Sequence, residues 1–158
     1  MASFETLQVL VADDNAHMRT IVVEVLKSIG IRSIRECRDG SEALNALRDF
    51  AADVAIVDFH MAPMDGVEFT RKVRADKAAS YLPIIMLTGY ADKARVLKAR
   101  DSGITELIVK PVTAKAVISR LNSVIFHPRQ FVRAEAYFGP DRRRNPLPGY
   151  KGPERRKA

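Results

Sequence analysis

The chain has 158 residues and a formal net charge of +7, and 47% of its residues are apolar. These values fit one globular domain with some additional length, and no apolar run approaches the ~18 residues of a membrane-spanning helix. The first ten residues lack the features of a signal peptide, and the single cysteine, Cys37, cannot form an internal disulfide. We therefore expect a cytoplasmic protein with no membrane span.

Short apolar strands alternate with amphipathic helices from residue 7 to residue 126. The strands are expected at 7–12, 31–37, 54–58, 83–88 and 105–109. The helices are expected at 16–30, 40–50, 66–76, 92–103 and 113–126. This alternation is typical of a parallel sheet with helices on both faces.

The composition of the individual elements predicts their places. Continuous apolar strands are expected in the middle of the sheet, and the strand of mixed polarity at 31–37 is expected at an edge. Ser41 is the candidate N-cap of the second helix, and Gly103 follows the end of the fourth. We predict an α/β domain over residues 1–126, a flavodoxin-like doubly wound sheet of five parallel strands in the order 2-1-3-4-5.

Residues 127–158 differ in composition from the rest of the chain. They contain 9 Lys or Arg, 3 Asp or Glu, and 5 of the 8 prolines. A unit of the form Tyr-x-Gly-Pro-acid-Arg-Arg-basic occurs at 137–144 and again at 150–157. The segment has too little apolar surface to fold alone, so we expect a basic tail and no separate output domain.

Reactive side chains stand at the carboxyl ends of four predicted strands. Asp13 and Asp14 follow the first strand, Asp58 ends the third, Thr88 ends the fourth and Lys110 follows the fifth. A single aspartate at such a place is most often a turn former. Because ligands of doubly wound folds bind beyond the carboxyl ends of the strands, we expect these five side chains to form one site.

Three neighbouring carboxylates repel one another unless a cation lies between them. A divalent cation such as Mg²⁺, or Mn²⁺ in its place, accepts carboxylate oxygens, a backbone carbonyl and a phosphate oxygen as ligands. A lysine and a hydroxyl group nearby would bind the remaining oxygens of a phosphoryl group. The predicted chemistry is phosphoryl transfer to an aspartate.

Four segments of the sequence resemble the receiver domain of two-component response regulators. They are VLVADDN, VAIVDFHMAPMDG, PIIMLTGYAD and LIVKP. Their order and spacing are similar to those of chemotaxis-type receivers, with 44 residues from Asp14 to Asp58, 30 to Thr88 and 22 to Lys110. The resemblance covers about residues 5–126.

The resemblance implies a role for each matching residue. Asp58 would accept a phosphoryl group from a histidine kinase or phosphotransfer protein, with Lys110 and the Thr88 hydroxyl on the phosphoryl oxygens. The Lys110–Pro111 bond would be cis. The magnesium ligands would be Asp14, Asp58 and the backbone carbonyl of His60, and Asp13 would act through a metal-bound water.

The sequence departs from the family pattern in two places. The proline of the loop after Asp58 stands one position late, at Pro63, and Leu107 occupies a position that often holds a switching Tyr or Phe. Tyr90 could take over part of that signalling or could only cover the rim of the site. We further expect His60 and Tyr90 to obstruct water and prolong the life of the phosphoryl group.

Several alternatives remain open from the sequence. The tail could be an inert extension, bind a nucleotide such as cyclic di-guanylate, or bind nucleic acid through charge. An aspartyl-phosphate phosphohydrolase would carry a second aspartate where His60 stands, so we expect a signalling protein and not an enzyme. The resemblance allows a homodimer through the fourth helix, fifth strand and fifth helix. The candidate anion-binding residues of the tail are Arg142, Arg143, Arg144, Arg155 and Arg156.

Overall fold

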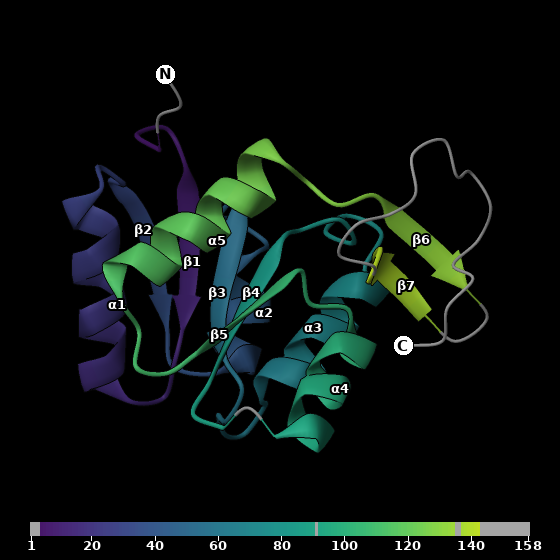
Figure 1. Cartoon of the computed structure of the whole chain (residues 1–158). Coiled ribbons are helices and arrows are strands. Elements are labelled where there is room, and N and C mark those ends of the chain that lie inside the picture. Colours follow the sequence, from purple (N-terminus) through teal and green to yellow (C-terminus); the bar gives the residue numbers. More distant parts are fainter. Residues whose placement is uncertain (1–3, 91, 135–136, 143–158) are drawn as a thin grey trace.

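A five-stranded parallel sheet in the order β2-β1-β3-β4-β5 forms the centre of the molecule (Figure 1). The computed structural model describes residues 4–90, 92–134 and 137–142. The strands are β1 Gln8–Ala12, β2 Ser33–Cys37, β3 Val54–Asp58, β4 Ile84–Thr88 and β5 Glu106–Val109. This topology confirms the predicted doubly wound fold, including the edge position of the strand of mixed polarity.

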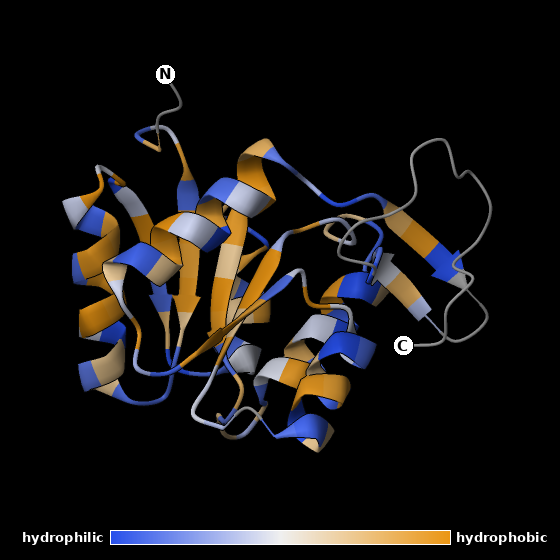
Figure 2. Cartoon of the chain, viewed as in Figure 1, coloured by the Kyte–Doolittle hydropathy of each residue, from blue (hydrophilic) through white to orange (hydrophobic). Residues whose placement is uncertain are grey.

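Helices cover both faces of this sheet (Figure 1). One face carries α1 Ala16–Ser28 and α5 Ala114–Phe126. The other carries α2 Gly40–Ala46, α3 Gly66–Ala75 and α4 Lys93–Ser102. The apolar sides of the helices face the strands, and the central strands are apolar along their length (Figure 2).

Alternate residues of each central strand supply two separate hydrophobic clusters. Val54 and Ile56 of β3 pack with Leu26 of α1 and Leu121 of α5. Ala55 and Val57 pack on the opposite face. Because β3 is buried on both faces, it holds its carboxyl end rigidly, and that end is Asp58.

The helix boundaries correct one prediction. The N-cap of α2 is Asp39 and not Ser41, because the Asp39 carboxylate accepts hydrogen bonds from the backbone N–H groups of Ser41 and Glu42. Ser41 lies inside the first turn of this helix. Gly103 follows the last residue of α4 and adopts φ 104°, a left-handed conformation that glycine allows. This conformation ends the helix, as predicted.

The beginning of the tail forms a β-hairpin that the sequence pattern does not predict. Strands β6 Phe131–Ala134 and β7 Tyr137–Pro140 pair antiparallel beside α3 and α4 (Figure 1). The rings of Phe131 and Phe138 contact Tyr81 in the connection before β4. The hairpin therefore obtains its apolar partners from the α/β domain, since an isolated hairpin is marginal in water.

The buried side chain of Arg74 joins the hairpin to the domain. Its guanidinium donates hydrogen bonds to the backbone carbonyls of Gly103, Ser80 and Leu82, and lies over the ring of Phe131. Burial lowers the pKa of Arg74 to about 10. Three separate segments thus meet at one side chain of α3.

A second set of contacts lies at the end of the hairpin. An Arg142 Nη2 atom lies 2.8 Å from Asp101 Oδ1, and the guanidinium stacks on Tyr137. The Tyr137 hydroxyl donates to the carbonyl of Pro140. Gly139 lies so close to Gly103 that a Cβ atom added to Gly139 would be 3.1 Å from the Cα atom of Gly103. Residues 137–142 of the first copy of the repeated unit therefore dock on the α/β domain, and the second copy lies outside the described residues.

None of the helices described here has the length and apolar character needed to cross a bilayer. The longest ones are amphipathic elements of the α/β domain.

Candidate functional site

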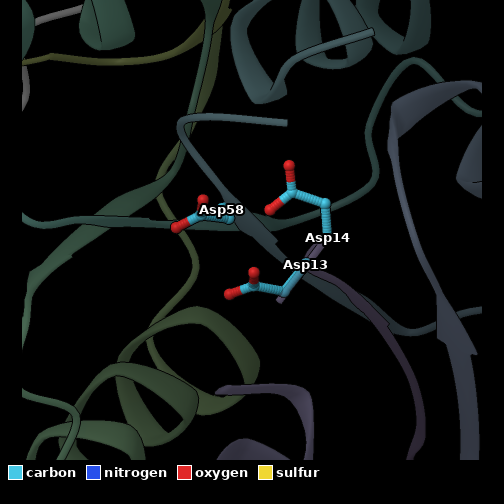
Figure 3. A group of neighbouring side chains, drawn as sticks. All are labelled: Asp13, Asp14 and Asp58. Carbon is cyan, nitrogen blue, oxygen red and sulfur yellow. The ribbon is translucent and has the colours of Figure 1, made fainter. Parts of the chain in front are cut away.

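The fold brings the five predicted residues to one edge of the sheet. Asp13 and Asp14 follow β1, and Asp58 ends β3 beside them (Figure 3). One ligand oxygen from each of these carboxylates lies within 4.8 Å of the others. The Lys110 Nζ atom is 2.7 Å from Asp58 Oδ1 and 3.9 Å from Asp13 Oδ2. Residues 97 positions apart in the chain thus meet as neighbours.

Asp58 is almost fully buried, with 5% of its surface exposed. Burial raises its pKa above the ordinary value, while the hydrogen bond and charge of Lys110 oppose that rise. Asp14 adds to the rise by charge repulsion. The lysine therefore favours the ionised carboxylate, which is the form that can attack phosphorus.

Asp13 is also buried, and only one of its two oxygens has a hydrogen-bond partner. Oδ1 accepts from the backbone N–H of Asn15, whereas Oδ2 accepts no hydrogen bond from any residue that the structure describes. Burial is the main cause that raises the pKa of Asp13, and the charge of Asp58 adds to it. A buried oxygen without a donor, next to two further carboxylates, fits a hard divalent cation.

Thr88 and Lys110 are joined through the backbone at the ends of β4 and β5. The backbone N–H of Lys110 donates to the carbonyl of Thr88. The Lys110–Pro111 bond is cis, as the resemblance implies. The buried Thr88 hydroxyl donates to the carbonyl of Tyr90 at 2.8 Å, so here it points to its own loop.

Gly66 is a site residue for which sequence reasoning assigned no role. It is the first residue of α3 and packs against the backbone of Asp58. A Cβ atom added to Gly66 would collide with the Asp58 backbone carbonyl. The signal was present in the Met-Asp-Gly turn, but only the close approach of the two segments explains it. Asp65 of the same turn caps α3 by accepting from the N–H of Glu68.

The comparisons with known proteins agree with this geometry. Residues 9–122 match the family described as the response regulator receiver domain. The chain belongs to this family. Apart from Gln8 of β1, the match includes all five strands of the sheet and every residue of the candidate site, so this receiver works in two-component signal transduction as a phosphoacceptor.

Relatives and solved structures show the same receiver over most of the chain. The chemotaxis protein CheY-3 of Vibrio cholerae is 31% identical over 120 residues, which are 76% of this chain and 92% of that protein. The structure of CheY4 of Vibrio cholerae has a TM-score of 0.71 at 30% identity, covering 75% of this chain and 98% of that one.

A further solved structure bears on the metal. The receiver domain of the sensor histidine kinase PA1611 from Pseudomonas aeruginosa has a TM-score of 0.69 at 25% identity, covering 77% of this chain and 96% of that one. That domain is described with a magnesium ion in its active-site cleft. In the present chain the carboxylates of Asp13, Asp14 and Asp58 form an acidic cluster whose oxygens are close enough together to hold a metal ion.

The two residues expected to obstruct water border the receiver site. His60 and Tyr90 are exposed and stand two positions after Asp58 and Thr88. Arg95 of α4, which sequence reasoning missed, contacts both of them. Leu107 is half-buried against the α2–α4 side of the core, and its carbonyl accepts from Arg120. Their effects on signalling remain predictions.

The structure describes only one of the arginines predicted to bind an anion. Arg142 is held by Asp101 and Tyr137. The others, Arg143, Arg144, Arg155 and Arg156, lie outside the described residues. The hairpin also contacts α4, so it covers part of the face predicted for a homodimer. Anion binding by the tail and pairing through this face both remain predictions.

Proposed function

We propose that this receiver is a cytoplasmic switch of a phosphorelay, phosphorylated on Asp58 by a histidine kinase or phosphotransfer protein. The strongest support for Asp58 as the phosphoacceptor is the position of its carboxylate. The Asp58 carboxylate lies 2.7 Å from Lys110 Nζ and shares a pocket with two further carboxylates. A nucleophile, a cation to pair with the incoming phosphoryl oxygens and a metal pocket therefore occupy one place.

The transfer step follows from these positions. An Asp58 carboxylate oxygen attacks phosphorus, the phosphorus–nitrogen bond of the donor's phosphohistidine breaks, and the departing nitrogen regains a proton. Lys110 moves its ion pair from the carboxylate to a phosphoryl oxygen. A bound Mg²⁺, or Mn²⁺ in its place, would offset the negative charge on the transferred oxygens, held by Asp14, Asp58 and the His60 carbonyl, with Asp13 acting through water.

Thr88 couples phosphorylation of Asp58 to a change in the neighbouring loop. In the present structure its hydroxyl donates to the Tyr90 carbonyl. A phosphoryl oxygen on Asp58 is a stronger, charged acceptor for the same hydroxyl. When Thr88 turns to that oxygen, it releases the Tyr90 segment, and a partner protein binds the altered surface. The protein acts by this switch and not by turnover of substrates.

Mass spectrometry after incubation with acetyl phosphate and Mg²⁺ tests the assignment. We expect one added phosphoryl group on the wild type and none on Asp58→Ala. Asp49→Ala is the matched control, because Asp49 is an exposed carboxylate that pairs with Arg35 at 3.4 Å and does not belong to the carboxylate cluster of the site. Equal labelling of all three proteins refutes the assignment. Release of many equivalents of phosphate from small esters would indicate a phosphohydrolase instead.

A further inference from the structure

Arg95 contacts both loops that border the phosphoacceptor site. It lies in the first turn of α4, and its Nη1 atom is 3.1 Å from His60 Nε2. Its guanidinium carbon lies 4.5 Å from the centroid of the Tyr90 ring. Its Nε atom is 3.4 Å from Asp92 Oδ2, which keeps the side chain against its own helix. One arginine thus connects the loop after β3 to the loop after β4.

The contact with His60 has a defined direction. The guanidinium has only donors, so in this hydrogen bond His60 Nε2 is the acceptor, a role that it has in the tautomer with its ring proton on Nδ1. The ring also meets Phe59 edge-on, with centroids 4.9 Å apart. These two contacts restrict the orientation of the imidazole.

The contact with Tyr90 is the main restraint on that ring. Tyr90 is 64% exposed. No other residue in the described part of the chain stacks on the Tyr90 ring or hydrogen-bonds to its hydroxyl. The Tyr90 backbone carbonyl accepts from Thr88, so the segment is tied to the site on one side and to Arg95 on the other.

We propose that Arg95 is a positioning residue that holds His60 and Tyr90 across the entrance to Asp58 and so prolongs the aspartyl phosphate. Hydrolysis requires a water oxygen to attack phosphorus opposite the Asp58 oxygen. The phosphorus–oxygen bond to Asp58 then breaks, giving the free carboxylate, inorganic phosphate and a released proton. Two rings held over the entrance limit this approach of water. The inference rests on the proposed phosphorylation of Asp58.

The test measures the decay of the phosphorylated protein after acetyl phosphate is removed. For Arg95→Ala we expect the phosphoryl group to be lost roughly 3- to 10-fold faster. This factor corresponds to the loss of an interaction worth about one net hydrogen bond. Arg95→Lys should fall between, because an ammonium can donate to His60 or lie over Tyr90 but lacks the planar fork for both. Arg100→Ala is the control, since Arg100 lies on the same helix and contacts neither loop through a described hydrogen bond or ion pair.

A double-mutant comparison separates positioning from a direct effect. In the His60→Ala/Tyr90→Ala background, Arg95→Ala should change the decay no further, because the residues it positions are gone. Unchanged decay in Arg95→Ala alone overturns the inference. So does an equal acceleration in both backgrounds, which would mean that Arg95 acts without the two rings. Failure of the wild type to take up phosphate at all refutes the proposed function instead.

Discussion

Replacing Asp13 with asparagine is expected to stabilise the fold when divalent cations are absent. Asp13 is 1% exposed, and its Oδ2 atom accepts no hydrogen bond from the described residues. The substitution removes a buried charge and supplies an amide N–H that can donate to Asp58. Such a gain is typical of functional sites, where groups needed for chemistry are kept at the expense of stability.

The magnitude follows from three contributions. Attraction to Lys110 at 3.9 Å is about 4 kcal/mol at an effective dielectric constant near 20. Repulsion from Asp58 within 4.8 Å is about 3.5 kcal/mol on the same basis, so the two nearly cancel. The cost of the buried, unpaired oxygen remains, about 1–3 kcal/mol. This corresponds to a rise in Tm of roughly 3–10 °C for a domain of this size.

The assay is thermal unfolding of wild type and Asp13→Asn in EDTA, with Asp49→Asn as an exposed control that should change little. The pH dependence has a definite sign. Burial raises the folded-state pKa of Asp13 above 3.8, so its acid form is favoured in the fold. The penalty in the wild type is therefore absent at low pH and grows as pH rises through that raised pKa. A less stable Asp13→Asn at pH 7, or an advantage that grows on acidification, would refute the reasoning.

The remaining predictions concern the metal and two glycines. Mg²⁺ should raise the Tm of the wild type and raise that of Asp13→Asn less, because one carboxylate of the pocket is lost. Gly66→Ala should destabilise the protein by about 1–3 kcal/mol and slow labelling of Asp58, since its Cβ meets the Asp58 carbonyl, whereas Gly89→Ala, with open space at its Cβ, should do neither. Gly139→Ala places a Cβ 2.7 Å from the Tyr137 hydroxyl, so proteases should cleave the β6–β7 hairpin faster while labelling stays normal. Normal labelling of Gly66→Ala or unchanged proteolysis of Gly139→Ala would contradict these assignments.

The order and spacing of the motifs were enough to predict the α/β domain and the location of its site. Apolar runs of four or five residues mark the central strands, and the polar residue that ends each run marks the carboxyl edge. Because the carboxyl ends of parallel strands lie at the same edge of the sheet, the motif order alone predicts that Asp58 and Lys110 lie together. The cis bond before Pro111 came from the family resemblance and is present in the structure.

Sequence patterns predicted the structure less well where two neighbouring residues could each cap the same helix. Asp39 and Ser41 can each cap α2, and the structure selects Asp39 because its carboxylate reaches two N–H groups of the first turn. The hairpin was missed because the tail has few apolar residues of its own. The half-buried rings of Phe131 and Phe138 pack against Tyr81, and the Phe131 ring lies against Arg74, so the partners that stabilise the hairpin lie in another part of the chain.

Short-range periodicity was enough to predict the helices and strands, and their alternation along the chain led to the order of the sheet. The residue that ends the third strand, Asp58, is the phosphoacceptor that the family resemblance implies. The packed structure was needed to show that Arg95 meets His60, that Arg74 lies against Phe131 of the hairpin and that Gly66 must lack a side chain. Each of these is a contact between side chains or backbones from separate elements. Such contacts depend on how helices and loops pack across the sheet, and no local pattern encodes them.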